Sequence, residues 1–222
     1  MRRIIFLLIP VLFAVSCVQD ITDLNESAID SKDKIEMSFN AVLDAQTKLT
    51  IGDPVQGSEG NKYPVLWKNE DAISIFPHIE GSTDTLSSNQ FITYLDEPSV
   101  STTFTGFSEF ADAYYALYPY NPLNQWLPEE MAIYARMFYA QYTENYLRPS
   151  MIAIESDGKL SFQHLFGFIK LTVPDTVTDL ARIKFSATNT HIAARFMKVY
   201  PETMTIGELI TPMNYVNLYP TD

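Results

Sequence analysis

The residues that could do chemistry are few, and their spacing supports no catalytic or metal centre. His78, His164 and His191 lie far apart in the sequence, and none of them stands in an HExxH or similar ligand pattern. The sequence contains no GxSxG elbow, no phosphate-binding loop and no GxGxxG turn. We therefore expect no metal ion and no cofactor.

Two pairs of adjacent acids are the remaining candidates for catalysis. Glu129 with Glu130, and Asp96 with Glu97, could act as acid and base in glycoside hydrolysis. Adjacent acids on a surface are far more often solvated, so we expect a protein that is not an enzyme. His164 lies between two apolar runs, where a hydrogen-bonded, structural histidine is the better interpretation.

Cys17 is the single cysteine, and its position gives it a role. Two arginines near the start are followed by an apolar stretch at 4–15, which fits a signal peptide and is short for a transmembrane helix. Ala14, Val15 and Ser16 then lead into Cys17, which resembles the lipobox of bacterial lipoproteins. In that class the thiol is diacylated, the signal is cut before the cysteine, and the new N-terminus is acylated. The alternative is an ordinary secretory signal with a chance cysteine.

Residues 18–34 are polar and acidic and contain no Gly or Pro. They would form a tether that holds a domain off the membrane, or simply a solvated tail. Asp20 and Asp23 faintly resemble the acidic signals that send some lipoproteins to the outer face of the outer membrane. We therefore expect a surface-exposed protein on the cell outer membrane, attached through its lipid.

Charge and composition limit the classes of partner and fold. All 27 acids lie after Cys17, against 13 of the 15 bases, so the chain beyond the signal carries a net charge of −14. Such a chain repels phosphate backbones, and we expect no nucleic-acid partner. With 46% hydrophobic and 13% aromatic residues, the sequence has ample material for a folded core.

The body of the chain has the pattern of a β protein. Ile35, Met37, Phe39, Ala41 and Leu43 alternate with mostly polar residues, as in a half-buried strand. We expect further short strands at 65–67, 72–76, 91–95, 102–105, 114–118, 151–154, 160–163, 166–173, 183–187, 196–199 and 215–219. Many short strands separated by turns predict a sandwich or barrel. Only 128–146, which opens with Pro-Glu-Glu, could be helical.

Two aromatic stretches allow a more specific prediction. Trp67 and 73–76 flank a polar turn, as in a hairpin. The run 114–118 puts aromatic side chains on both faces of a strand, which favours core packing. Tyr rings also have apolar faces and polar edges, so a sugar-stacking platform is the alternative.

Several phrases, in this order behind a lipobox, resemble the fimbrillin family of cell-surface lipoproteins. They are the strand at 37–43 with TKLT at 47–50, WKNEDAISIF at 67–76, TFTG at 103–106 leading to YYALYPY at 114–120, and PSMIA at 149–153 followed by LSFQH at 160–164 and FIKL at 168–171. The resemblance covers about residues 36–190.

The resemblance implies an all-β chain with a transthyretin-like β-sandwich, usually one of two in tandem. It would divide the chain into a signal (1–17), a tether (18–34), an N-terminal sandwich (35–177) and the start of a second β domain or closing strands (178–222). Family members polymerise by strand addition, in which an extended segment of one subunit completes the sheet of the next. In polymerising members, a protease first cuts after an Arg behind the first strand.

This sequence departs from that pattern, because no Arg lies between Cys17 and Arg136 and the loop after Leu43 offers only Lys48. Lys48 is therefore the candidate processing site. The candidate donor strand is Ile35–Leu43, because few constraints would hold its N-terminal end next to the tether. The prediction is a structural fimbrial component, whether subunit, tip or anchor, that mediates adhesion and has other fimbrial subunits as partners. The alternative is a monomeric surface lipoprotein that binds a glycan or a host protein.

Overall fold

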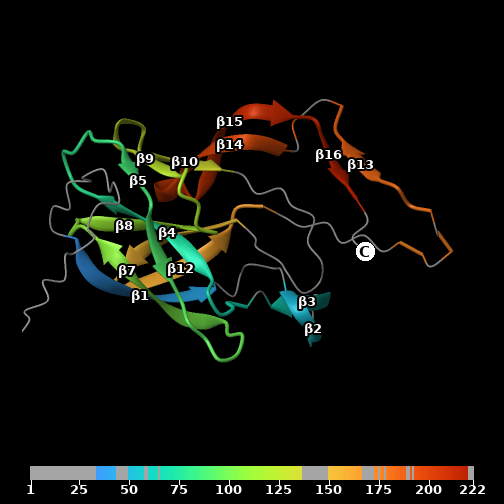
Figure 1. Ribbon diagram of the computed structural model, residues 1–222, viewed down its shortest axis with the longest axis horizontal. Coiled ribbons are helices and arrows are strands. Elements are labelled where there is room, and N and C mark those ends of the chain that lie inside the picture. The colour runs from blue at the N-terminus through green and yellow to red at the C-terminus, as the bar shows by residue number, and fades with distance from the viewer. Residues whose placement is uncertain are drawn as a thin grey trace, which may run out of the picture. The chain divides into compact units, whose positions relative to one another are not determined.

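Figure 1 presents the computed structural model of the chain. It describes residues 34–43, 50–57, 60–64, 66–136, 150–166, 173–174, 176–177, 179–188, 191 and 193–219, with 50–57 and 60–64 as backbone alone. Contacts within the chain separate two units, Met1–Ser31 and Lys32–Asp222, and every described residue belongs to the second.

The described residues confirm the predicted all-β class. Most of them lie in strands, and within these ranges helix is limited to two 3-10 turns, η1 (Pro128–Glu130) and η2 (Pro201–Thr203). None of the described helices is long and apolar enough to span a lipid bilayer.

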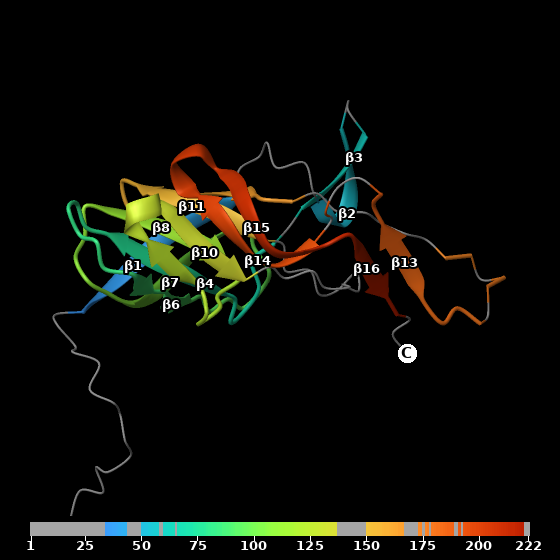
Figure 2. The same cartoon turned by 90° about the horizontal axis from the view of Figure 1, so that it is seen from above.

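Seven strands form a closed barrel in which each strand bonds to two neighbours (Figures 1 and 2). Their order around the barrel is β1 (Ile35–Leu43), β12 (Lys159–His164), β11 (Met151–Ser156), β8 (Ala113–Tyr118), β4 (Ala72–His78), β6 (Asn89–Ile92) and β7 (Ser101–Ser108). Neighbouring strands run antiparallel, except that β1 and β12 run parallel.

A second sheet of five strands packs against the barrel. Its order is β15 (Thr205–Met213), β14 (Ala193–Tyr200), β10 (Ala132–Arg136), β9 (Gln125–Leu127) and β5 (Leu86–Ser87). Two further pairs are β13 (Ile183–Ser186) with β16 (Tyr215–Leu218), and β2 (Thr50–Gly57) with β3 (Gly60–Pro64).

Two hydrophobic cores follow from this arrangement. The first fills the barrel, where the Trp67 ring meets the edges of Phe104, Tyr118 and Phe162 at centroid distances of 5.1, 5.2 and 5.2 Å. The second lies between β4, β8 and β11 of the barrel and the five-stranded sheet, and includes Phe76, Tyr115, Leu117, Trp126, Ile133, Ile152, Met197 and Val199. Strands buried on both faces need near-continuous apolar sequence, which explains the runs at 73–76 and 114–118.

The structure corrects two predicted elements. The helix at 128–146 is wrong beyond its first turn where it is described: η1 ends at Glu130, Met131 follows with a φ of 49°, and β10 then begins, with Ile133 and Ala135 facing the core. The hairpin between Trp67 and 73–76 is also wrong. Trp67 bridges Ser99, while β4 has both edges occupied by β6 and β8. Of the predicted strand at 166–173, residues 167–172 lie outside the described ranges.

Candidate strand-exchange site

Strand β1 closes the barrel between two unlike neighbours. With β7 it forms an antiparallel ladder from Ile35 opposite Ser108 to Val42 opposite Ser101. With β12 it forms a shorter parallel ladder, which begins at Asn40 opposite Lys159. The first half of β1 is therefore paired on one side, and the second half on both.

The side chains of β1 alternate as the sequence predicts, with one exception. Phe39 and Ala41 are 3% and 0% exposed, and Met37 and Leu43 pack partly buried against the same core. Ile35 is 48% exposed, because it lies at the end of the barrel, beyond the interior. It was predicted as part of the apolar face of the donor strand, and four residues rather than five fill the barrel.

Phe39 is the central contact of β1 with the barrel interior. Its ring lies 5.5 Å from Phe91 of β6 and 5.2 Å from Tyr114 of β8, centroid to centroid and tilted. Removing β1 would expose these rings, together with Phe104 of β7 and Phe162 of β12, which line the same core.

The N-terminal end of β1 is held, contrary to expectation. The Lys34 ammonium donates a hydrogen bond of 2.8 Å to Asn89 Oδ1 of β6. Asn89 in turn donates through Nδ2 to Ser108 Oγ of β7, 3.0 Å away in a buried contact. Nothing in the local sequence around Lys34 indicates this link, because Asn89 and the Ser108 to which Asn89 bonds lie on two distant strands.

The C-terminal half of β1 carries further bonds to its surroundings. The Asn40 amide donates to the carbonyl of Gly158 at 3.1 Å, and the Leu43 amide donates to that of Val100 at 3.3 Å. On the outer face, Thr103 Oγ1 donates to Asn40 Oδ1 at 3.0 Å. Peeling β1 from its first residue thus breaks fewer bonds than peeling it from its last.

The two other residues of this prediction, Cys17 and Lys48, lie outside the described residues. The structure therefore describes the candidate donor strand in place, and its exchange, like the lipid attachment and the processing site, stays a prediction.

The tyrosines of 114–118 form core, as the sequence analysis favoured, rather than a sugar platform. Tyr114, Tyr115 and Tyr118 are 6%, 1% and 3% exposed. The Tyr115 hydroxyl donates to Glu202 Oε1 at 2.5 Å, and burial together with this carboxylate raises the pKa of Tyr115. The Tyr118 hydroxyl donates to Asp71 Oδ1 at 2.9 Å.

Asp71 stabilises the polar turn that follows Trp67. Its buried carboxylate accepts a hydrogen bond from the Lys68 amide at 2.8 Å and one from the Tyr118 hydroxyl. It therefore links the turn to β8, a structural role that the local sequence does not indicate.

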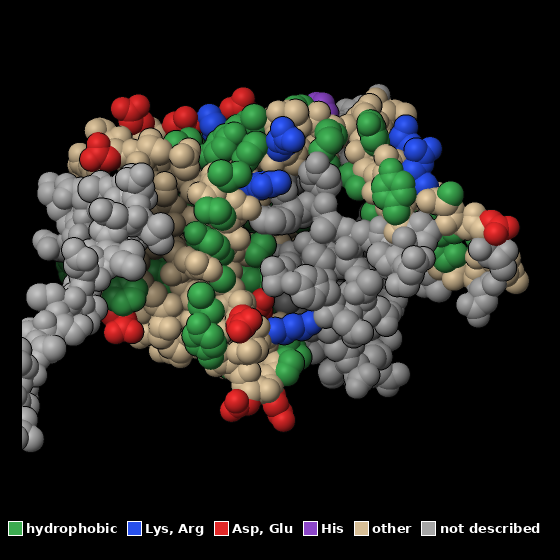
Figure 3. Space-filling view, viewed as in Figure 1, with side chains coloured by type: hydrophobic (Ala, Val, Ile, Leu, Met, Phe, Trp, Pro, Cys, Tyr) green, Lys and Arg blue, Asp and Glu red, His purple; other side chains and the backbone are tan. Residues whose placement is uncertain are grey.

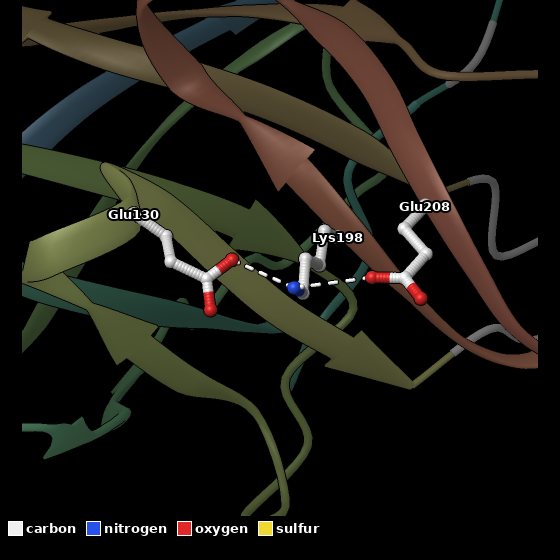
Figure 4. A network of polar contacts seen from close by, with 3 residues as sticks. All are labelled: Glu130, Lys198 and Glu208. Carbon is white, nitrogen blue, oxygen red and sulfur yellow. Dashed lines mark ion pairs between the residues drawn. The ribbon is translucent and has the colours of Figure 1, made fainter.

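The acid pairs lie on the surface. Asp96, Glu97 and Glu129 are exposed. Glu130 pairs with Lys198 at 2.7 Å, and Glu208 of β15 pairs with the same ammonium at 3.1 Å, so Lys198 lies between two carboxylates (Figure 4). Both carboxylates raise the pKa of Lys198. Acidic and basic side chains are interspersed over the face seen in Figure 3, with a broken band of hydrophobic side chains between them.

The histidines do not converge. His78 contacts the rings of Tyr115 and Trp126, His164 ends β12 and is half-buried, and His191 is exposed. Among the described residues, no group of three or more His, Cys, Asp or Glu side chains is placed to hold a metal ion.

Comparison with family models, with curated proteins and with solved structures finds no match to this chain. The fold and the geometry around β1 are accordingly the basis for assigning a function.

Proposed function

We propose that this chain is a non-enzymatic structural component of cell-surface fimbriae, of the fimbrillin kind, anchored to the outer membrane by a lipid on Cys17. It assembles with other subunits by β-strand addition and mediates adhesion as a subunit, tip or anchor. A transthyretin-like β-sandwich is the finer architecture within this proposal. Of the two roles expected for residues 178–222, closing strands fit better than a second β domain, because β14 and β15 complete the sheet of β10, β9 and β5.

The observation that carries the proposal is the place of β1 in the barrel. It is the first strand of the described chain and pairs with both β7 and β12, and its Phe39 and Ala41 are buried in the core. β1 can be exchanged without threading the other described strands, because all of them follow it in the sequence.

The side chains that β1 buries determine how strongly the emptied groove would bind a replacement strand. Burial of Phe39 and Ala41, with partial burial of Met37 and Leu43, is worth on the order of 4–6 kcal/mol. The backbone ladders add specificity of register, as in other strand additions. An emptied groove would therefore strongly favour capture of a strand with the same alternation.

The test uses a variant that begins at Leu49, mixed with a synthetic peptide spanning residues 35–43. We expect the variant to bind the peptide one to one and to regain cooperative melting. A matched peptide with Phe39→Asp should not bind, because its carboxylate would be buried among Phe91 and Tyr114.

A truncated chain that stays a soluble, stable monomer and ignores the wild-type peptide would contradict strand exchange. That result would favour the alternative of a monomeric surface lipoprotein that binds a glycan or a host protein. Trypsin treatment of the chain without its signal gives a second readout, since release of β1 should produce strand-linked oligomers.

A further inference from the structure

Four large hydrophobic side chains are exposed at the end of the barrel where β1 begins. They are Ile35, Ile79, Phe107 and Phe110, with exposed fractions of 48%, 39%, 59% and 79%. We call this group the barrel-end patch. Single exposed hydrophobic residues are common, but several at one end of a domain indicate a contact surface.

Strand register and local hydrogen bonds bring the four residues to the same end. Ile35 lies opposite Ser108, and Phe107 lies opposite Glu36. Ile79 directly follows β4. Its two neighbours are bonded to Asp112, which precedes β8: the Asp112 amide donates to the His78 carbonyl at 3.0 Å, and the Glu80 amide donates to Asp112 Oδ2 at 2.9 Å.

Both cartoon views agree with this placement. The start of β1, the β4–β5 connection and the β7–β8 connection lie at one end of the barrel in Figures 1 and 2.

Phe110, the most exposed of the four residues, lies in a turn that hydrogen bonds hold in place. The Tyr114 hydroxyl accepts a hydrogen bond from the Ala111 amide at 3.0 Å and donates one to the Glu109 carbonyl at 3.0 Å. Ala111 also packs against the barrel core. Phe110 lies between Glu109 and Ala111, whose backbone groups both bond to the Tyr114 hydroxyl. The fold therefore directs the Phe110 ring outward.

We propose that the barrel-end patch docks on an uncharged lipid surface and seats the barrel on the membrane. This rests on the proposed lipidation of Cys17. In the sequence, residues 18–34 separate that cysteine from Ile35 of the patch, and a chain of that length spans at most about 60 Å. The tether thus joins the barrel at the end that carries the patch.

The charges around the patch select the kind of surface. Glu36, Glu80 and Asp112 are exposed beside it, and Glu109 is half-exposed, so these carboxylates outnumber the neighbouring Lys34, whose ammonium donates to Asn89. These carboxylates would be repelled by anionic lipids. The lipid surface is therefore zwitterionic, and attraction comes from burial of the aromatic and aliphatic side chains. A barrel seated in this way fits the anchor of a fimbria better than its shaft or tip.

The experiment uses the chain from position 17 to 222 with Cys17→Ser, so that no acyl chain contributes. Sedimentation with phosphatidylcholine vesicles should show binding. Phe107→Thr combined with Phe110→Ser should weaken the partition coefficient by about tenfold or more, because two rings no longer enter the interface. Circular dichroism should be unchanged, since both side chains are exposed.

Two controls make the comparison specific. Tyr94→Ser changes a residue that is 70% exposed in the β6–β7 connection, outside the patch, and should leave vesicle binding unchanged. Adding phosphatidylglycerol to the vesicles should weaken binding, and added salt should reduce that effect by screening the carboxylates.

Absence of vesicle binding, or equal binding by the double variant, would overturn the proposal. So would a double variant that loses self-association in analytical ultracentrifugation, because the patch would then face a second copy. The assay needs neither lipidation nor strand exchange, so its failure is separable from failure of the fimbrial function.

Discussion

Lys34 and Asn89 are joined by a hydrogen bond of 2.8 Å across 55 positions of the sequence. This bond fastens the residue before β1 to a strand on the far side of β7. Any displacement of β1 that starts from its N-terminal end must break it first, so Lys34 sits where release of the strand would begin.

Lys34→Met should loosen β1 without unfolding the barrel. The lost bond involves a charged donor at the surface, and we expect a loss of about 1 kcal/mol in stability. Hydrogen exchange should show faster exchange of the amides of residues 35–39 than in the parent, with residues 40–43 less affected because β12 also pairs with them. Lys159→Met, at an exposed position on β12, is the matched control. Uniformly faster exchange along β1 would argue against peeling from the N-terminal end.

Ile75→Asp should abolish cooperative folding. Ile75 is 0% exposed in the barrel core, on a strand whose two edges are both paired. An unpaired charge there costs several kcal/mol, out of a margin of about 5–15 kcal/mol for a domain. Thermal melting followed by circular dichroism measures this. Thr105→Asp, on the exposed face of β7, should melt close to the parent, and a near-normal melting point for Ile75→Asp would contradict the placement of this side chain.

Stability should fall in mildly acidic solution, in part through His164. Burial lowers the pKa of His164 below its usual value of about 6.5, so the unfolded chain takes up the proton first as pH falls. The folded state therefore loses stability from about pH 6.5 downward until its own lowered pKa is reached. His164→Gln should reduce the difference in melting temperature between pH 8 and pH 5. His191→Gln changes an exposed histidine and serves as control. An unchanged pH dependence in His164→Gln would contradict this role.

Cys17→Ala should stop labelling by palmitate and move most of the protein out of the membrane fraction, leaving only the weaker, reversible binding of the barrel-end patch. Acyl chains contribute about 0.8 kcal/mol per buried methylene, which the barrel-end patch cannot match. Fractionation of labelled cells measures both effects. A variant that keeps its label would show that another residue is lipidated, and the anchor assignment would be wrong.

Local pattern predicted much of the β structure. The alternation of residues 35–43 gave the strand and its inward face, and the aromatic run at 114–118 indicated a strand buried on two sides, as β8 is. In both cases the signal lies within a few residues, because side-chain direction in a strand repeats every second residue.

The local sequence pattern could not predict which distant segments of the chain pair with one another. Trp67 bridges Ser99 rather than the adjacent strand, and Lys34 bonds to Asn89; neither partner has a signal near the residue concerned. The helix predicted at 128–146 followed from Pro-Glu-Glu, but Met131 takes a left-handed conformation that ends the turn. β15 escaped prediction because Gly207 and Pro212 interrupt its sequence, although Gly207 leaves room for the Tyr200 ring.

The parallel ladder between β1 and β12 has a consequence for the order of events during synthesis. β7 follows β1 early, but β12 is made much later, and the barrel cannot close until residue 164 has left the ribosome. Until then, one side of residues 40–43 has no native partner. Pairing between distant segments is slow because it needs a large loop to close. A newly made chain thus passes through an interval in which β1 is open to another molecule, and this interval ends only when β12 pairs with residues 40–43.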